Sequence, residues 1–526
     1  MKLYRSFATV GGLTLVSRVL GFVRDILFAW AFGSGWVADA FNVAFRFPNL
    51  FRRLFGEGAF NSAFVPLFAK RLEGEGKESA RVFAEEAMSG LVFVLLILSV
   101  IFIVGMPWLM YGLAPGFSAD QQKFDLAVLL TRITFPYLLC MSLVALLSGV
   151  LNSFGKFVES SAVSIVLNLT LTVAIFIGFW LGFHNEPGGG IIQAVGVFVA
   201  GLLQLWLLLN GVRRNGFALK LRRPRMTEGV RRLISLGLPG VVAGGVTQLN
   251  IMIGTMIASM QPGAVSQLYY ADRLYELPLA IVGIAIGVVL LPEVSRHLRA
   301  GNHEAVMDSQ NRSLEFAMLL TIPAALALAV IPAEIVRVLF ERGAFKAADT
   351  ATTAAVLGVF ALGLPAFVLI KVFSPAYFAR EDTKTPMRYA AISLTANTIG
   401  SIALFFLFRH LGFIPQLGIA VATTLGGWLN AFLLWSTLRA RGEFVADARL
   451  RRNLPLIILA GLIMAGVLLV AVRWLDPYLQ VSRGFVVESG ALALLVGAGA
   501  LVYAIAILAT GVMSAGQLSR FTGRRR

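Results

Sequence analysis

Apolar segments of about 20 residues recur along the whole chain, separated by short polar, glycine- or proline-containing stretches. A segment of that length crosses the hydrocarbon core of a bilayer as a helix. The pattern predicts fourteen such spans, centred near residues 20, 50, 97, 138, 170, 202, 247, 280, 320, 361, 396, 425, 463 and 500. We therefore expect an all-α fold, that of a polytopic membrane protein.

Composition agrees with this expectation. Hydrophobic residues make up 58% of the 526 positions, against about 45–50% in soluble globular domains. The net charge of +17 would suggest a nucleic-acid partner in a soluble chain. Here it is better explained by cytoplasmic loops rich in lysine and arginine beside anionic lipid, so no nucleic-acid partner is expected.

The basic residues also predict the orientation of the chain. An even number of spans puts both termini on one side, and 30 lysines and arginines fall in the loops and tails of that side against 7 on the other. Both termini are therefore expected in the cytoplasm. The loop 331–349 is basic on the outer side, where a short amphipathic interfacial helix would explain it.

The stretch 17–60 carries many charges within an apolar context. An ionised side chain at bilayer depth costs roughly 2.5–3.5 kcal/mol on insertion scales, so these groups must face water, one another or a ligand. A polar cavity inside the helix bundle is the natural inference. The charged residues of the stretch are Arg18, Arg24, Asp25, Asp39, Arg46, Arg52, Arg53 and Glu57.

Spacing supports a shared face for several of them. Residues three or four apart lie along one stripe of a helix, and this holds for Asp39, Asn42, Arg46, Asn49 and Arg53. An alternative remains open for the second half of the stretch. Its arginines and Glu57 could form a cytoplasmic helix end, with Arg53 and Glu57 paired four residues apart.

Further charged residues fall inside later spans: Arg132, Arg273, Lys371, Asp272 and Glu276. Across all spans this gives eight basic residues against five acidic ones. An excess of positive charge in a low-dielectric bundle calls for a counter-anion, so the ligand of the cavity should carry about two or more negative charges. Arginine predominates, and its planar fork suits phosphate oxygens.

A weak internal repeat predicts the domain organisation. Pro48 corresponds to Pro278 and Pro66 to Pro292, at offsets of 230 and 226. Duplicated helical lobes around a site near the bilayer midplane are typical of transporters. We expect an N-lobe of six helices at 1–214, a basic cytoplasmic linker at 215–230, a C-lobe of six helices at 231–438, and two further helices with a cytoplasmic tail at 439–526.

Motifs for chemistry are absent from the sequence. It has no HExxH, nucleophile elbow or P-loop, and Cys140 is its only cysteine. The four histidines, His184, His297, His303 and His410, lie in loops or at the ends of spans. We therefore expect no enzymatic activity, no metal site and no cofactor.

Four stretches of the chain resemble the MurJ (MviN) lipid II flippase family, within the multidrug/oligosaccharidyl-lipid/polysaccharide exporter superfamily. They are SRVLGFVRD from Ser17, ADAFNVAFRFPNLFRRLFGEGAF from Ala38, YYADRLYELP from Tyr269 and AREDTKTP from Ala379. The resemblance extends over essentially the whole chain, including two helices after the two six-helix lobes.

The resemblance implies a function in peptidoglycan synthesis, and hence in cell-wall biogenesis and cell shape. Two pseudo-symmetric bundles would carry the undecaprenyl-diphosphate-linked disaccharide-pentapeptide from the inner to the outer leaflet of the bacterial cytoplasmic membrane by alternating access. The family's cavity arginines correspond to Arg18, Arg24, Arg52 and Arg273, which would hold the diphosphate. Its acidic partner corresponds to Asp39, and the groove for the undecaprenyl tail to the last two spans.

The resemblance also bears on the energy source of transport and on the binding partners. Some relatives are thought to bind sodium through an aspartate of the seventh helix, whereas this seventh span offers only Gln248 and Asn250. We therefore expect the membrane potential or another ion gradient as the energy source. Lipid II and membrane lipids are the expected partners, proteins of cell-wall synthesis or division are further candidates, and the chain is expected to be a monomer.

An exporter of another polyprenyl-linked glycan fits the same charge pattern, but a cation-drug antiporter would need an excess of acidic cavity residues. A membrane enzyme acting on polyprenyl phosphates would need a base or metal cluster.

Overall fold

The structure, a computed structural model, describes residues 2–52 and 59–513. These residues are helical nearly throughout and contain no strand. The helices of the first part are α1 (Lys2–Phe32), α2 (Trp36–Arg52), α3 (Ala59–Gly74), α4 (Lys77–Leu113), η2 (Pro115–Ala119), α5 (Gln121–Thr134), α6 (Tyr137–Ser153), α7 (Val158–Trp180), α8 (Pro187–Arg214) and α9 (Glu228–Ala258). Those of the second part are α10 (Ala264–Arg299), α11 (His303–Val330), α12 (Pro332–Phe340), α13 (Ala347–Phe378), α14 (Lys384–His410), α15 (Gln416–Ala440), α16 (Ala448–Leu475), η3 (Asp476–Tyr478), η4 (Val481–Arg483) and α17 (Phe485–Ala509).

Helix length and composition confirm an all-α polytopic membrane protein. Ten helical segments of the described residues are long and apolar enough to cross a bilayer, with α5 and α6 together forming one of them. The remaining long helices α1, α9 and α10 have 31, 31 and 36 residues, more than the roughly 20 that a span needs. With α2 and α3 as one further segment, this arrangement is consistent with fourteen spans.

The chain forms two compact units. Unit 1 comprises residues 1–266 and 343–345, and unit 2 comprises 267–342 and 346–526. Helix α9 therefore belongs to unit 1, where it packs on α3, α4 and η2. The expected lobes rest on the sequence repeat rather than on packing, so their boundaries stay a prediction.

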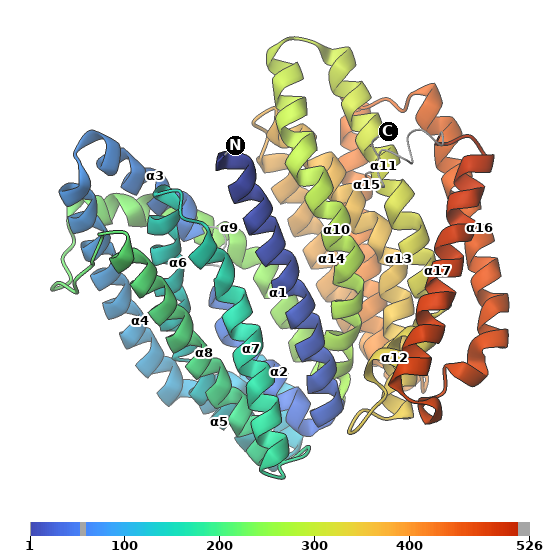
Figure 1. The fold of residues 1–526 in the computed structure, drawn as a ribbon, viewed down its shortest axis with the longest axis horizontal. Coiled ribbons are helices and arrows are strands. Elements are labelled where there is room, and N and C mark those ends of the chain that lie inside the picture. The colour runs from blue at the N-terminus through green and yellow to red at the C-terminus, as the bar shows by residue number, and fades with distance from the viewer. Residues whose placement is uncertain (1, 53–58, 514–526) are drawn as a thin grey trace. The chain divides into compact units, whose positions relative to one another are not determined.

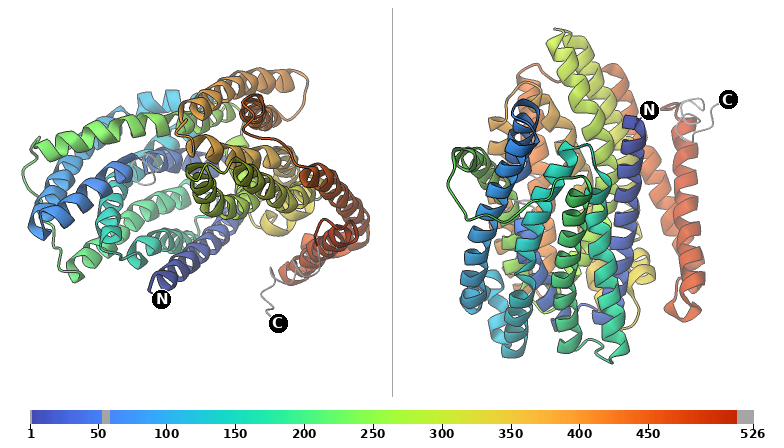
Figure 2. Two further views of the ribbon diagram at one scale, coloured as in Figure 1. Left: turned by 90° about the horizontal axis from the view of Figure 1, so that it is seen from above. Right: turned by 60° about the vertical axis from the view of Figure 1, so that its left-hand side comes forward.

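In unit 1, α1, α7 and α8 run side by side (Figures 1 and 2). The chain that follows α8 has no regular secondary structure until α9, and it is bound to the end of α4 instead. The buried carboxylate of Glu85 accepts the backbone N–H of Lys220 at 3.0 Å and the Nε–H of Arg222 at 2.5 Å. Phe217 is buried against Phe68 and Phe154. The basic segment is thus fixed to unit 1 rather than loose.

Three of the prolines inside the helices are compensated by side chains of neighbouring helices. A proline has no N–H for the carbonyl four residues earlier, and inside a membrane that carbonyl needs another donor. In unit 1, Thr134 donates its hydroxyl to the carbonyl of Ala44 at 3.0 Å, the group left open by Pro48. Two further cases involve Pro107 and Pro323 and are described below.

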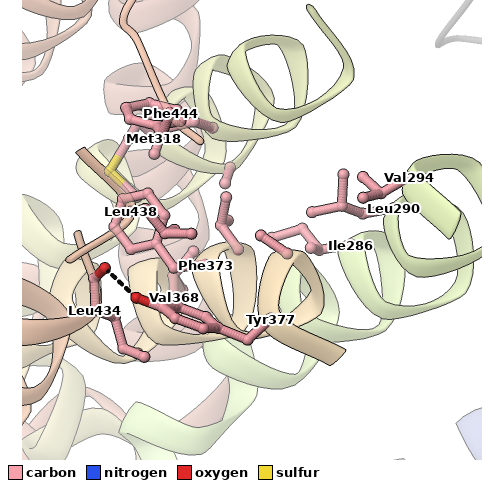
Figure 3. Close-up of a cluster of buried hydrophobic side chains, with 14 of the residues drawn as sticks. Ile286, Leu290, Val294, Met318, Val368, Phe373, Tyr377, Leu434, Leu438 and Phe444 are labelled. Carbon is pink, nitrogen blue, oxygen red and sulfur yellow. Dashed lines mark hydrogen bonds between the residues drawn. The ribbon is translucent and has the colours of Figure 1, made fainter. Parts of the chain in front are cut away.

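The core of unit 2 lies where α10, α11, α13 and α15 meet. Figure 3 shows Leu290 of α10 and Met318 of α11 in the same cluster as Phe373 of α13. Tyr377 donates its hydroxyl to the carbonyl of Leu434 at 2.7 Å, which joins α13 to α15. This apolar packing holds α10 in place.

Helix α12 confirms the short helix that we expected in the basic loop 331–349. Its neighbours also explain why basic residues are tolerated there. Arg337 contacts Asp476, with 3.5 Å between Nη1 and Oδ1, and Arg342 pairs with the buried Glu488 of α17. Helices α16 and α17 run next to each other at the edge of unit 2 (Figures 1 and 2).

Candidate functional site

The first charged cluster lies in the middle of α1. Arg24 donates to Oδ1 of Asp25 from both Nη2, at 2.6 Å, and Nε, at 3.1 Å. Its Nη1 donates to Oδ1 of Asn168 on α7 at 3.1 Å. The side chains of Arg24 and Asp25 are buried. Three charge-assisted hydrogen bonds therefore offset the desolvation of this arginine.

Asn168 also anchors α7 to the backbone of α1. Its Nδ2 donates to the carbonyl of Ser17 at 2.9 Å. Gly21 makes this approach possible, because a Cβ built there would lie 3.2 Å from the Asn168 amide nitrogen. Asn168 thus joins the guanidinium of Arg24 to the helix that carries it.

Arg18, about 1.7 turns before Arg24 on α1, differs from it. Its side chain is exposed, and it has no ion pair among the residues that the structure describes. A cation in the middle of a 31-residue apolar helix with no carboxylate beside it remains able to bind an external anion.

The second cluster surrounds Asp39 of α2, which is fully buried. Its Oδ2 accepts Lys123 Nζ at 2.7 Å and the Gly263 N–H at 2.9 Å. Its Oδ1 accepts the N–H and the hydroxyl of Ser266 at 3.0 and 2.8 Å. The carboxylate therefore binds open amides at the start of α10, where negative charge is favourable.

This geometry corrects two expectations. The resemblance predicts Asp39 as the partner of cavity arginines, but in unit 1 its ion-pair partner is Lys123. Lys123 is one of the seven basic residues expected in the outer loops, yet it lies in the first turn of α5, is buried, and has its Nζ 4.2 Å from the centroid of the Phe117 ring. Asn42, from the predicted stripe, donates to the hydroxyl of Ser266 at 3.1 Å.

Other contacts hold the corner between α9 and α10 against unit 1. Arg46 donates to the hydroxyl of Thr255 on α9. The Gly116 N–H donates to the hydroxyl of Ser259 at 3.0 Å. A Cβ at Gly116 would lie 2.3 Å from the carbonyl oxygen of Ser259, so only glycine fits there. The corner 255–266 is thus fixed by polar contacts with α2 and η2.

Arg132 was counted with the charged residues of the spans, and its contact is a structural one. Its Nε donates at 2.9 Å to the carbonyl of Ile103, the group that Pro107 leaves without a donor inside α4. The hydrogen bond of this arginine thus supports a proline-containing helix of unit 1.

The charged residues of unit 2 lie on α10 and α13. Arg273 donates from Nη1 to Glu276 at 3.3 Å and from Nη2 to the hydroxyl of Tyr269 at 3.2 Å, and its guanidinium covers the Tyr269 ring. Asp272, next to Arg273, is partly buried. Lys371 is exposed, and its stem lies along α10 at Gly283, where a Cβ would be 2.9 Å from its Cδ.

Part of the expected site lies among residues that the structure does not describe. Arg53 and Glu57 lie outside the described residues, and Arg52 is described only as the last residue of α2. The expected pair of Arg53 and Glu57 therefore stays a prediction. The assignment of Arg18, Arg24, Arg52 and Arg273 to one diphosphate clamp likewise stays a prediction.

Three residues of these clusters were missed from the sequence. Asn168 is an amide in an otherwise apolar stretch of α7, which is a usable signal. Lys123 and Ser266 sit in ordinary polar sequence, and only packing brings them to Asp39. Among the residues described, no group of three or more histidine, cysteine, aspartate or glutamate side chains could hold a metal ion.

The fold and these buried ion pairs define a class of protein: multi-pass helical membrane proteins of the transporter type. An inward-facing multidrug resistance transporter of the MOP superfamily has the same fold, with a TM-score of 0.66 at 15% identity over 81% of this chain and 95% of its own.

Closer comparisons define the family. The model of the family "Lipid II flippase MurJ" matches residues 28–486. A probable lipid II flippase MurJ from Rhizobium tropici is 45% identical over 528 residues, covering 100% of this chain and 98% of its own. The lipid II flippase MurJ of Burkholderia cenocepacia is 36% identical over 89% of this chain and 90% of its own. A solved structure of lipid II flippase MurJ in an inward closed conformation has a TM-score of 0.76 at 26% identity, over 98% of this chain and 99% of its own. The chain belongs to the MurJ family of lipid II flippases and is a multi-pass inner-membrane protein.

Proposed function

We propose that this protein moves lipid II from the inner to the outer leaflet of the cytoplasmic membrane by alternating access. Family membership supports the substrate. The observation that carries the chemistry is Arg18, a cation in the middle of α1 with no ion pair among the described residues. The diphosphate of lipid II would supply the negative charge that pairs with Arg18.

The proposed roles of the other charged residues follow from their contacts. Arg24 is held in a fixed direction by Asp25 and Asn168, so it presents a preorganised donor set. Arg273 is oriented by Glu276 and Tyr269. Arg52 completes the proposed clamp. Lys371 adds positive charge in unit 2, and the undecaprenyl tail would stay in lipid beside α16 and α17.

Orientation, energy source and partners belong to the same proposal. Both termini lie in the cytoplasm, because 30 basic residues fall in the loops of that side against 7 on the other. The membrane potential or an ion gradient drives the cycle, and the protein works as a monomer without a cofactor or catalytic step.

Arg18→Ala is the cleanest test, because Arg18 has no ion pair among the described residues, whereas Arg24→Ala would also remove the ion pair between Arg24 and the buried Asp25. Loss of one charge-assisted hydrogen bond of about 1.5–3 kcal/mol should weaken lipid II binding by the purified protein about 10- to 150-fold. The same variant should fail to support growth of cells depleted of their own flippase, at normal membrane abundance.

Arg132→Gln is the matched control. It also removes an arginine from a span, but one that donates to the backbone of α4. It should lower stability and leave the lipid II affinity of the folded protein unchanged. Undecaprenyl phosphate, which has one phosphate less, should bind more weakly than lipid II. Unchanged lipid II affinity in Arg18→Ala would overturn the proposed clamp.

A further inference from the structure

A long apolar groove lies between α15 and α16 in unit 2, with α11 and α13 as its floor. Two adjoining cavities of about 480 and 400 Å³ form it, and both are lined by Leu314, Leu369, Trp428 and Leu454. The α15 side continues through Phe432 and Trp435, and the α16 side through Ile458 and Leu462. These positions recur every three or four residues, so each helix turns one face into the groove. Helix α17 contributes no lining residue.

The length of the groove matches one leaflet. On α16 its lining runs from Leu450 to Leu462, a rise of twelve residues or about 18 Å of helix. One leaflet contributes about 15 Å of the hydrocarbon core. Its walls are accessible from outside, since Phe432 is 57% and Leu462 53% exposed. The groove therefore suits a single acyl chain that lies along α16.

One end of the groove carries positive charge without compensation. Arg451 lines the groove, and the guanidinium of Arg439 lies over the ring of Trp435, 5.5 Å from its centroid. Neither arginine has an ion pair in the described part of the chain. The carboxylates nearby in sequence and structure are already paired: Glu315 with Arg312 and Arg449, Asp447 with Arg312, Asp382 with Arg441, and Glu443 with Arg380.

We propose that this groove binds one acyl chain of an anionic glycerophospholipid, whose phosphate is held by Arg439 and Arg451. Basic pockets beside transmembrane helices suit anionic head groups, and the two arginines lie at the end where α15 meets α16. With the proposed orientation, this end faces the cytoplasmic leaflet. The groove is too short for an undecaprenyl chain, so its occupant is distinct from the transported lipid.

The test is a titration of the delipidated protein with phosphatidylglycerol or phosphatidylcholine, followed by native mass spectrometry. The wild-type chain should bind one phosphatidylglycerol at least about tenfold more tightly than phosphatidylcholine. The double variant Arg439→Gln/Arg451→Gln should lose this preference, because each arginine contributes a charge-assisted hydrogen bond worth about tenfold or more. Ile458→Trp, which fills the groove, should weaken binding of both lipids.

Matched controls separate the groove from general charge and bulk. Arg452→Gln removes the neighbouring exposed arginine, which does not line the groove, and Leu459→Trp adds the same bulk one residue further along α16. Both should bind phosphatidylglycerol as the wild type does. Equal affinity of the wild type for the two lipids, or an equal loss in Arg452→Gln, would overturn the proposal. Displacement of phosphatidylglycerol by equimolar undecaprenyl phosphate would assign the groove to the polyprenyl tail instead.

Lipid II binding measured on the same variants keeps the two proposals apart. It should be unchanged in Arg439→Gln/Arg451→Gln and in Arg452→Gln, because none of these arginines belongs to the proposed diphosphate clamp. Failure of the wild type to bind lipid II would count against the proposed transport function, and it would leave the preference for phosphatidylglycerol as a separate result.

Discussion

The hydroxyl of Tyr503 on α17 donates a 2.7 Å hydrogen bond to the carbonyl of Leu319 on α11, the carbonyl that Pro323 leaves without a donor. A proline in one helix thus leaves the acceptor by which another helix docks. Thr134 and Arg132 make the same kind of contact in unit 1. Polar residues within apolar spans therefore join helices to one another.

We expect Tyr503→Phe to lower the free energy of unfolding by about 0.6–1.7 kcal/mol, the range for interhelical hydrogen bonds in membranes. The reason is that the Leu319 carbonyl then has no donor. In a Pro323→Ala background, residue 323 regains its N–H, so the same change should cost less. Denaturation of the four proteins of this double-mutant cycle in bicelles measures the coupling. Additive effects would show that the hydroxyl and the proline-freed carbonyl are not linked.

A second prediction concerns the buried pair of Asp39 and Lys123. Lys123→Met leaves Asp39 charged and fully buried, and removal of one partner of such a pair typically costs about 3–5 kcal/mol. Asp39→Asn combined with Lys123→Met should recover much of this loss. Thermal unfolding of the single and double variants measures the recovery.

Asp125→Asn is the control for that experiment, since Asp125 is exposed on the same helix as Lys123. It should leave stability within experimental error. If the double variant were as unstable as the sum of the two singles, Asp39 would act through Gly263 and Ser266 alone, without a contribution from the lysine.

The third prediction is a pH dependence at the turn between α13 and α14. Asp382 accepts the N–H and the hydroxyl of Thr385 and an N–H of Arg441. These hydrogen bonds, first that from the Thr385 backbone, lower the pKa of Asp382 to about 2. The pKa of Asp382 is about 4 in the unfolded chain and lower in the folded protein, so the carboxylate stabilises the fold above about pH 4. This stabilisation is lost as the pH falls toward 2.

Melting temperatures in nanodiscs at pH 5 and pH 3 check this. The decrease should be larger for the wild type than for Asp382→Asn, which has no carboxylate to protonate at this position. Glu381→Gln, which removes the adjacent carboxylate, should retain the wild-type decrease. Equal decreases in the wild type and Asp382→Asn would contradict the assignment.

The sequence by itself determined the fold class, because a run of 20 apolar residues has few stable alternatives to a membrane-spanning helix. It also determined the short helix α12, in which the charged residues Glu334 and Arg337 lie three apart among apolar ones, as on one face of a helix. The family could be inferred from local motifs such as that around Arg24, since these motifs are contiguous in the chain.

Only the tertiary structure decided which charges neutralise each other. Asp39 meets Lys123 across 84 positions and Ser266 across 227, and Arg24 meets Asn168 across 144. Helical periodicity tells which residues of one helix share a face, but not which helix lies opposite. It also cannot tell that Arg132 serves the carbonyl freed by Pro107 rather than a ligand. An unpaired polar group is costly in the membrane, and the packing of helices distant in sequence determined which partner each of these groups has.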